Sequence, residues 1–291
     1  MRSFRDVLEY CGKEGVPFYK AVLDMDSSES GISAKETEEL MKGRLFDMER
    51  SVKEAVSKRW EPSIAAADAP LMGARAKEGK TFSGPLVSRA SELALAVSTY
   101  NACMGRIVAA PTAGSCGIIP GILFAFREVQ AASDDLLLKG LITAAGVGEI
   151  IAARATLAGA EGGCQAECGA AAAMAAAALV TMSDGSDDMV AESVAITVKS
   201  IMGLVCDPVA GLVEVPCIKR NGSLVALAAI GADMAMAGIK SVIPPDEVID
   251  AMGHVGRSLP DSLRETAKGG IAVTPRGKEI AKNLKPGSKG E

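Results

Sequence analysis

The sequence contains a single histidine, His254, among its 291 residues. A zinc site built from two or three histidines is therefore excluded, and a Ser-His-Asp triad would need this one residue. His254 stands in Met-Gly-His-Val-Gly, which carries no catalytic signature, so we expect a structural or surface histidine. No Cys-x-x-Cys pair occurs either. Structural zinc and thioredoxin-like redox chemistry thereby lose their usual basis.

Positive charge, long apolar runs and a secretion signal are also lacking. The net charge is −5, and nucleic-acid affinity depends on clustered Lys and Arg, so we predict no nucleic-acid partner. The longest apolar run, Gly169 to Met182, has about 14 residues, short of the roughly 20 that cross a bilayer, so we predict a buried core helix and no membrane partner. The first residues contain no apolar stretch, and the cysteine count is odd at seven. We expect reduced thiols and a cytoplasmic protein.

Aromatic residues are only 3 % of the chain, whereas glycine (31) and methionine (13) are abundant and 48 % of the residues are hydrophobic. Small and flexible side chains are typical of helices that approach one another closely. No series of alternating strands and no internal repeat is present. The sequence predicts a mainly α fold, a compact multi-helix domain in which small-residue loops carry the functional site, without a large sheet.

Capping patterns and apolar spacing predict the helices. Ser3 with Asp6 starts a first helix that Gly12 and Gly15 would end, and Ser33 with Glu36 starts a long amphipathic helix from Ala34 to about Trp60. That helix either packs on the body or docks a partner, and packing is the preferred reading. Further helices are predicted at 85–102, 122–129, 136–157, 169–181, 189–204, 223–237 and 246–257, with a short one opened by Pro260.

The domain organisation predicted from these patterns has four parts. Residues 1–62 form an N-terminal helical region, and 63–84 form a loop or linker, because Pro, Gly and a Lys-rich tip interrupt any period. Residues 85–284 form the helical domain that carries the site. Residues 285–291 form a frayed, flexible tail.

Two segments place thiols beside residues that turn the backbone sharply. Glu161 to Gly169 reads Glu-Gly-Gly-Cys-Gln-Ala-Glu-Cys-Gly, and Cys206 to Cys217 reads Cys-Asp-Pro-Val-Ala-Gly-Leu-Val-Glu-Val-Pro-Cys. Cys11 and Cys103 lack such a setting and fit simple packing. Three thiolates, from Cys164, Cys206 and Cys217, could hold a four-iron cluster whose fourth iron stays open, and an open metal position is where substrate binds.

Four motifs together resemble the iron-sulfur-dependent L-serine dehydratases, and more narrowly their separate alpha subunit. The resemblance is specific from about Pro85 to Thr274 and looser through the N-terminal helices. The motifs are Glu-Gly-Gly-Cys164-Gln-Ala-Glu167, the stretch from Cys206 through Cys217-Ile-Lys-Arg-Asn221, Ala-Pro111-Thr112-Ala-Gly114, and Arg264-Glu-Thr-Ala-Lys-Gly-Gly270.

This resemblance implies conversion of L-serine to pyruvate and ammonia with a 4Fe-4S cluster and without pyridoxal phosphate. By the same similarity Cys164, Cys206 and Cys217 match the three cluster ligands. The open iron would act as a Lewis acid on the serine hydroxyl while a base removes the Cα proton. Single-chain members of the family carry a further small α/β domain with a Ser/Thr-rich substrate loop, and nothing before Pro62 in this sequence resembles it. The resemblance therefore implies a separate beta subunit as partner, and a homo-oligomer is a further option.

Several roles stay open at this point. Cys168 would share a helical face with Cys164 and is an alternative ligand, ranked second. Cys116 lines the substrate site or simply packs. The catalytic base is unassigned, with Glu167 and Lys219 as candidates by position, although either could instead support the cluster structurally.

Thr112, Ser115 and Asn221 are candidates for binding the substrate carboxylate or ammonium through hydrogen bonds.

Two other functions compete with serine dehydration. One is a related cluster-dependent lyase, either an L-cysteine desulfidase or an L-threonine dehydratase. The other is a non-catalytic helical subunit, regulatory or metal-sensing, in which a cluster or zinc only stabilises the fold.

Overall fold

The computed structural model describes residues 1–284, and in this range it contains thirteen α-helices and no β-strand. The predicted mainly α fold without a large sheet is confirmed. The tail predicted at 285–291 lies outside the described residues. The helices are α1 (Phe4–Glu14), α2 (Phe18–Ser30), α3 (Ala34–Ser57), α4 (Ala69–Lys77), α5 (Gly84–Ala102), α6 (Ile118–Gln130), α7 (Asp134–Arg154), α8 (Gly159–Gly162), α9 (Ala170–Met182), α10 (Asp187–Ile201), α11 (Cys217–Met236), α12 (Pro245–Ser258) and α13 (Pro275–Leu284).

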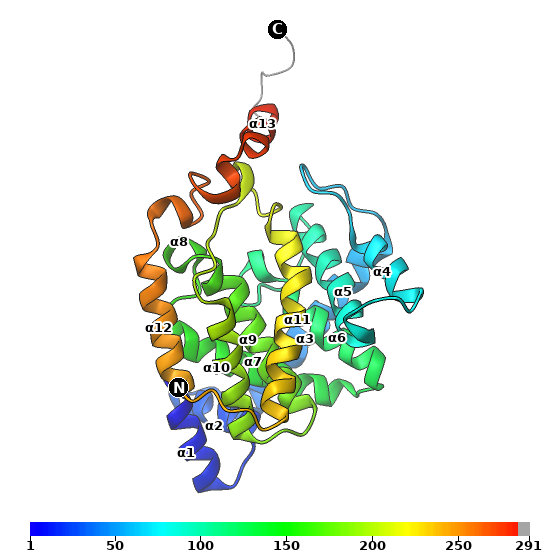
Figure 1. Ribbon diagram of the computed structural model, residues 1–291. Helices are drawn as coiled ribbons and strands as arrows, with labels where there is room; N and C mark the ends of the chain where they lie inside the picture. Colours follow the sequence, from blue (N-terminus) through cyan, green and yellow to red (C-terminus); the bar gives the residue numbers. More distant parts are fainter. Residues whose placement is uncertain (285–291) are drawn as a thin grey trace.

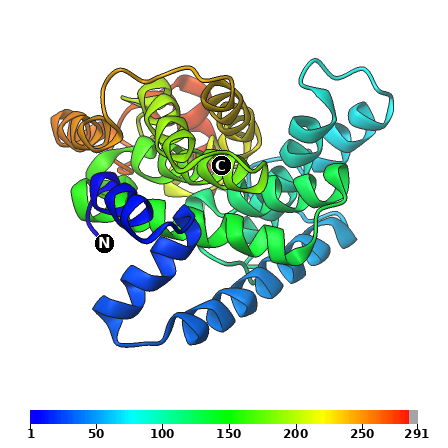
Figure 2. The ribbon, with the colours of Figure 1, turned by 90° about the horizontal axis from the view of Figure 1, so that it is seen from below.

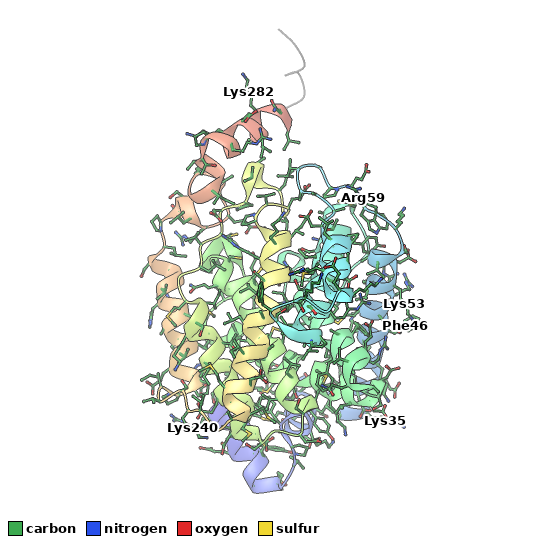
Figure 3. All side chains as sticks on the ribbon, turned by 45° about the vertical axis from the view of Figure 1, so that its right-hand side comes forward. Lys35, Phe46, Lys53, Arg59, Lys240 and Lys282 are labelled. Atoms are coloured by element: carbon green, nitrogen blue, oxygen red, sulfur yellow. The ribbon has the colours of Figure 1, made fainter. Side chains whose placement is uncertain are left out.

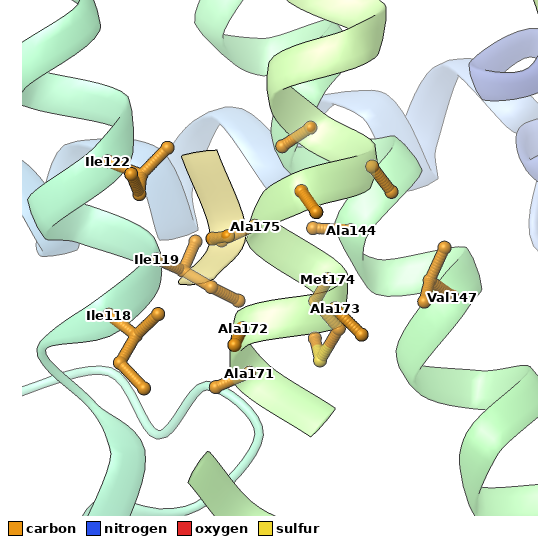
Figure 4. Packing of buried hydrophobic residues seen from close by; sticks show 14 of the residues in the cluster. Ile118, Ile119, Ile122, Ala144, Val147, Ala171, Ala172, Ala173, Met174 and Ala175 are labelled. Carbon is orange, nitrogen blue, oxygen red and sulfur yellow. The ribbon is translucent and has the colours of Figure 1, made fainter. Parts of the chain in front are cut away.

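Helix α9 occupies the interior, where it packs against α6, α7, α10 and α11 (Figure 1). Its alanines are fully buried, so neighbouring helices approach it closely. Figure 4 shows Ile118, Ile119 and Ile122 of α6 beside this alanine-rich helix. A Cβ on Gly148 of α7 would lie 2.8 Å from the terminal methyl carbon of Met174. Small residues therefore set the spacing of the core, as the composition predicts.

Two helical stretches are long and apolar enough to cross a membrane by length and composition, namely α7 and the run Gln165–Met182. Most of both stretches is buried among other helices of the protein. Core helices of globular proteins pass the same test. The second stretch includes the apolar run 169–182, which is confirmed as a buried core helix.

The N-terminal helices follow the predicted caps. The Ser3 hydroxyl accepts the Asp6 N–H at 3.0 Å, and Ser33 with Glu36 forms a complete capping box. Gly15 then ends α1 in the left-handed conformation, at φ 66°. Helix α3 packs on α5 and α7, as the preferred reading of the long amphipathic helix predicts. Figure 2 shows α3 (blue) along one edge of the molecule and the cyan segment around α4 projecting at a corner.

Three features differ from the sequence-based expectations. Helix α2 was not predicted, and its first amide, that of Phe18, is capped by the Asp187 carboxylate, 2.8 Å away across the fold. The expected loop at 63–84 contains α4. Gly73 allows this helix to pack closely against α5, because a Cβ at Gly73 would lie 2.3 Å from the Glu92 carboxylate. Helix α11 begins at Cys217, six residues before the predicted start. The division into domains stays a prediction.

Candidate metal centre and active site

The three cysteines singled out by sequence are brought together by three separate elements. Cys164 begins a π-helical turn (Gln165–Gly169) that continues into α9, Cys206 lies in the loop after α10, and Cys217 is the first residue of α11. All three are buried, and none forms a disulfide. They lie close enough for the charge of Cys164 to act on both of the other thiols.

Backbone contacts fix the position of Cys164. Gly163 precedes it at φ 76°, and a Cβ there would lie 2.8 Å from the carbonyl oxygen of Leu204. The same carbonyl accepts the Gln165 N–H at 3.1 Å, while the Gln165 amide oxygen accepts the Gly203 N–H at 2.8 Å. The turn at Cys164 is therefore held directly against the segment that leads to Cys206.

The late motif that begins at Arg264 holds Cys206 from the other side. The Cys206 N–H donates to the Leu263 carbonyl at 2.9 Å, and the Glu265 N–H donates to the Cys206 carbonyl at 2.8 Å. These two bonds form the isolated parallel bridge of the described residues. The motif thus contributes backbone support to the site.

The thiols differ in acidity. A hydrogen bond from Cys168 is the main reason why the pKa of Cys164 is lowered, and the nearby Arg220 guanidinium acts in the same direction. That bond and burial raise the pKa of Cys168 well above its usual value. Burial raises the pKa of Cys217 to about 12, and it raises the pKa of Cys206 as well. Cys164 is therefore the most acidic of these buried thiols.

Glu167 faces the thiols from the π-helical turn. Its carboxylate accepts a hydrogen bond from the Thr112 hydroxyl at 2.9 Å, and the Cys206 Sγ lies 3.9 Å from the other carboxylate oxygen. Burial raises the pKa of Glu167. A Cβ on Gly159 would lie 2.5 Å from this carboxylate and 3.4 Å from the Cys206 sulfur, so the site leaves no room for a side chain there.

Arg220 and Asp207 form a buried ion pair that the sequence reasoning missed. The guanidinium donates to Asp207 Oδ1 and to the Val205 carbonyl, each at 2.8 Å. The second Asp207 oxygen accepts the Ile271 N–H at 2.8 Å. Gly270 has φ 57°, and a Cβ on it would lie 2.2 Å from that oxygen. Both residues stand inside the Cys206–Asn221 motif, so proximity to the thiols in the sequence was the available signal.

Ser115 and Asn221 are fully buried and hold the loop before α6 in place. The Asn221 amide donates to the carbonyls of Gly114 at 2.7 Å and Cys217 at 2.9 Å, and its oxygen accepts the Gly117 N–H at 2.9 Å. The Ser115 hydroxyl donates to the Ala110 carbonyl and accepts the Thr112 N–H, and it also lies within hydrogen-bond distance of the Thr112 hydroxyl. Of the three residues predicted to bind substrate, Thr112 is the one that is only half-buried.

Four other candidates are placed away from the thiols or in the core. Lys219 is 67 % exposed and pairs with Asp68 at 2.8 Å, pointing to the surface. His254 is exposed, as the surface reading predicts. Cys116 is buried in the hydrophobic core, and burial raises its pKa to about 12. The same core contains Cys11, so its packing role is confirmed.

Glu214 lies in the loop between Cys206 and Cys217 and was also missed. Its buried carboxylate accepts three backbone N–H groups, those of Ser63, Ile64 and Ala65, at 2.7 to 3.0 Å. Carboxylates that accept several backbone N–H groups form strong, charge-assisted hydrogen bonds. The segment between α3 and α4 is thereby attached to the thiol loop.

The chemistry of the donor set is compatible with an iron-sulfur cluster. Among residues 1–284 no three His, Cys, Asp or Glu side chains already stand as ligands of one ion. A cluster differs in that each cysteine binds a separate iron, so its ligands are spread over a larger space. Three buried free thiols, one of them with a lowered pKa, and an adjoining guanidinium provide soft donors and offset negative charge.

The sequence is similar to known proteins over most of its length. The family described as Serine dehydratase alpha chain matches residues 13–272. L-serine dehydratase, alpha chain, of Peptoniphilus asaccharolyticus is 40 % identical over 286 residues, 98 % of each chain. The probable L-serine dehydratase, alpha chain, of Bacillus subtilis (strain 168) is 49 % identical over 230 residues, 79 % of this chain and 77 % of that relative.

A longer relative matches only in part. L-serine dehydratase 1 of Escherichia coli (strain K12) is 39 % identical over 182 residues, which cover 62 % of this chain but 40 % of that protein. The alpha-chain relatives, in contrast, match most or all of their own length. Both the motifs around the thiols and the extent of these matches lead to one conclusion: the chain belongs to the serine dehydratase alpha chain family.

Proposed function

We propose that this chain is the alpha subunit of an L-serine dehydratase that converts L-serine to pyruvate and ammonia. The observation that carries the proposal is the convergence of Cys164, Cys206 and Cys217 beside Glu167 in a member of this family. Loss of the Cα proton and of the β-hydroxyl group, as water, gives aminoacrylate. Its imine tautomer is hydrolysed to the two products, so no external oxidant or reductant is needed.

The cofactor in this proposal is a 4Fe-4S cluster held by Cys164, Cys206 and Cys217. When bound, a cluster with one iron free of protein ligands supplies a Lewis acid for the serine hydroxyl. Arg220 offsets the negative charge of the thiolates, and its bond to Asp207 keeps it in place. Cys168 donates a hydrogen bond to Cys164 and is assigned to that supporting role rather than to ligation.

Glu167 is the proposed acid-base residue. Of the two earlier candidates, Lys219 points to the surface and pairs with Asp68, whereas Glu167 lies beside the thiols. A carboxylate in this position can accept the Cα proton of a substrate bound beside the thiols. Thr112, which donates to Glu167, is proposed to orient the carboxylate and to contact the substrate. Ser115 and Asn221 are proposed to act by holding the loop that presents Thr112.

A separate beta subunit is the proposed partner. The name of the Peptoniphilus relative specifies an alpha chain, and the longer Escherichia relative contains a further region that this chain does not match.

The chain's seven cysteines are free in the structure. Free thiols and the proposed cluster both suit a reducing compartment, so we place the protein in the cytoplasm.

The test is anaerobic reconstitution of the full chain with iron and sulfide, with and without the beta partner. Pyruvate release from L-serine is assayed while the visible spectrum follows cluster assembly. We expect cluster absorbance and pyruvate formation, both lost in Cys164→Ala, Cys206→Ala and Cys217→Ala. Cys103→Ala, at a thiol outside the site, is the matched control and should retain both.

Two results would redirect the proposal. Faster turnover of L-cysteine or L-threonine than of L-serine in the same assay would identify a related lyase. A complete cluster without any turnover, even with the partner present, would indicate a structural cluster.

For Glu167→Gln we expect a normal cluster spectrum with kcat lowered at least a hundredfold and KM little changed, because only proton transfer is removed.

A further inference from the structure

The late motif Arg264–Gly270 holds an exposed carboxylate beside the thiols that the proposed dehydration does not use. Glu265 donates its backbone N–H to the carbonyl of Cys206 at 2.8 Å, so it directly adjoins one of the three convergent cysteines. Its side chain is exposed. Among residues 1–284 no group forms an ion pair or a hydrogen bond with its carboxylate. Glu265 is therefore available to a group that comes from outside the chain.

The backbone at Glu265 has a conformation that is unusual for this residue. Its φ is 62°, in the left-handed region, which costs free energy for a residue with a side chain. The chain is held there by the Glu265 bond to Cys206 and by the bond from the Cys206 N–H to the Leu263 carbonyl. The Thr266 hydroxyl also donates to the Asp261 carbonyl at 2.9 Å. Strained positions that several bonds maintain are common at ligand sites, so this conformation indicates that the placement of Glu265 matters.

The Glu265 carboxylate lies near the groups that are proposed to act on the substrate. Together with burial, its negative charge contributes to the raised pKa of the Glu167 carboxyl and of the Cys206 thiol, so it lies within electrostatic range of both. The Glu167 carboxylate accepts the Thr112 hydroxyl at 2.9 Å. Of the two neighbouring carboxylates, Glu265 is thus the one without a bonded partner in the described residues.

The basic side chains close to Glu265 do not neutralise it. Arg264 forms an ion pair with Asp261, and Arg220 forms one with Asp207 at 2.8 Å. Within residues 1–284 Lys268 of the same motif does not pair with Glu265 either. A cationic group that enters the site would therefore meet an unpaired carboxylate, and hydrogen bonds between such charged groups are stronger than those of neutral donors.

The substrate of the proposed reaction carries a cation of this kind. At neutral pH the amino group of an α-amino acid is mostly protonated, and it is attached to the same Cα whose proton Glu167 is proposed to accept. Ser115 and Asn221, which the sequence suggested for binding this group, use their polar atoms within the fold. The residues assigned above therefore leave the ammonium group without a charged partner.

We propose that Glu265 binds the α-ammonium group of the amino-acid substrate while Glu167 accepts the Cα proton. This inference rests on the proposed function and deepens it, because it assigns the group that selects an α-amino acid over a hydroxy acid. No bond forms or breaks at Glu265, which acts through its charge and its hydrogen bonds alone. Its backbone bond to Cys206 fixes the ammonium group relative to the thiols.

The test uses the chain reconstituted with its cluster and its beta partner. Glu265→Gln removes the charge at nearly constant size and should raise KM for L-serine at least about tenfold with kcat changed less than about threefold, because the contact exists equally in the ground and transition states. Glu265→Asp keeps the charge and should restore most of the affinity. The cluster spectrum should be the same in all three proteins. An unchanged KM in Glu265→Gln, or an equal rise in both variants, would overturn the proposal.

A second ligand separates the ammonium contact from a general disturbance of the site. 3-Hydroxypropanoate has the carboxylate and the hydroxyl group of serine but no ammonium group, and it is assayed as a competitive inhibitor. Its inhibition constant should be the same in the parent and in Glu265→Gln. An equal loss of affinity for L-serine and for 3-hydroxypropanoate would show that Glu265 acts only on the structure of the site, which contradicts the proposal.

Glu9→Gln is the matched control, because it removes the same charge from an exposed glutamate of α1. Figure 3 shows α1 (blue) at the opposite end of the molecule from Lys282 of α13, the helix that follows the late motif. This variant should leave the KM for L-serine and the inhibition constant unchanged.

Calorimetric titration with L-serine keeps this inference separate from the proposed function. If the parent binds L-serine without turnover, dehydration is refuted, and loss of that binding in Glu265→Gln would still support the ammonium site. Turnover with the same KM in the parent and in Glu265→Gln would support the dehydratase and overturn the ammonium site. If the parent shows no saturable binding of L-serine, both are overturned.

Discussion

Around α9 the interior consists mainly of alanine and larger apolar side chains, which form no hydrogen bonds. The thiol site beyond the N-terminal end of α9, in contrast, contains many buried polar groups. In the first region size alone decides what fits. In the second, Asp207, Glu214 and Asn221 each have several defined partners. The core is therefore sensitive to volume, and the site is sensitive to the loss of single donors and acceptors.

The largest effect is expected from removing volume in the core. Ile122→Ala, at a fully buried position of α6, should lower the free energy of unfolding by about 2 to 5 kcal/mol, because it loses apolar contact and leaves a cavity. Urea denaturation measures the change. Ile230→Ala is the control, since Ile230 is 52 % exposed, and it should cost less than about 0.5 kcal/mol. Similar costs at both positions would mean that the interior does not depend on volume.

A smaller effect is expected from breaking the buried ion pair of the site. Asp207→Asn keeps the size of the side chain but removes the charge that pairs with the partly buried Arg220, which should cost about 2 kcal/mol in the free energy of unfolding. The same variant should bind iron and sulfide more slowly, because Arg220 supports Cys164. Asp68→Asn breaks the exposed pair with Lys219 and should cost less than about 1 kcal/mol. If the two variants lose equal stability, burial does not distinguish the pairs.

The smallest effect concerns Cys116, whose thiol is buried in the hydrophobic core and not in the thiol site. Its folded-state pKa is about 12, against an ordinary value of 9.0, so the unfolded chain ionises first as the pH rises. The stability associated with this thiol is fully present below pH 9 and is lost between about pH 9 and 12. At pH 10 the loss is about 1.4 kcal/mol relative to pH 7.

Cys116→Ala isolates this contribution, since the variant keeps every other titrating group. The difference in unfolding free energy between parent and variant should shrink by the stated amount from pH 7 to pH 10. Guanidinium or urea melts at the two pH values provide the measurement. A difference that does not change with pH would place Cys116 in contact with water and assign it to the site region instead of the core.

Local signals in the sequence predicted the elements whose determinants are local. Ser3 and Ser33 cap their helices through residues three positions away, and both were recognised. The start of α2 depends on Asp187, which is 169 residues from Phe18 in the chain, so no local pattern could reveal it. The start of α11 at Cys217 was likewise missed because the Pro216 context suggested an irregular segment.

The candidate site divides in the same way. Glycine and proline neighbours pointed to Cys164, Cys206 and Cys217, and the structure brings these residues together, although their role as ligands stays a prediction. The sequence did not reveal Arg220 or Asp207, because their importance arises from contacts with Ile271 and Val205 that only the fold creates. Lys219 stood beside Arg220 in the sequence, yet successive helical residues point in different directions and it reaches the surface.

The three bonds that Glu214 accepts from Ser63, Ile64 and Ala65 also have a consequence for the order of folding. They join positions 149 to 151 residues apart, so the two ends of this long stretch of chain must be brought together before the bonds can form. Contacts of such separation form late and slow the folding of a chain. We expect α5 to α10 to associate first and the segment between α3 and α4 to dock afterwards, once the thiol loop exists to receive it.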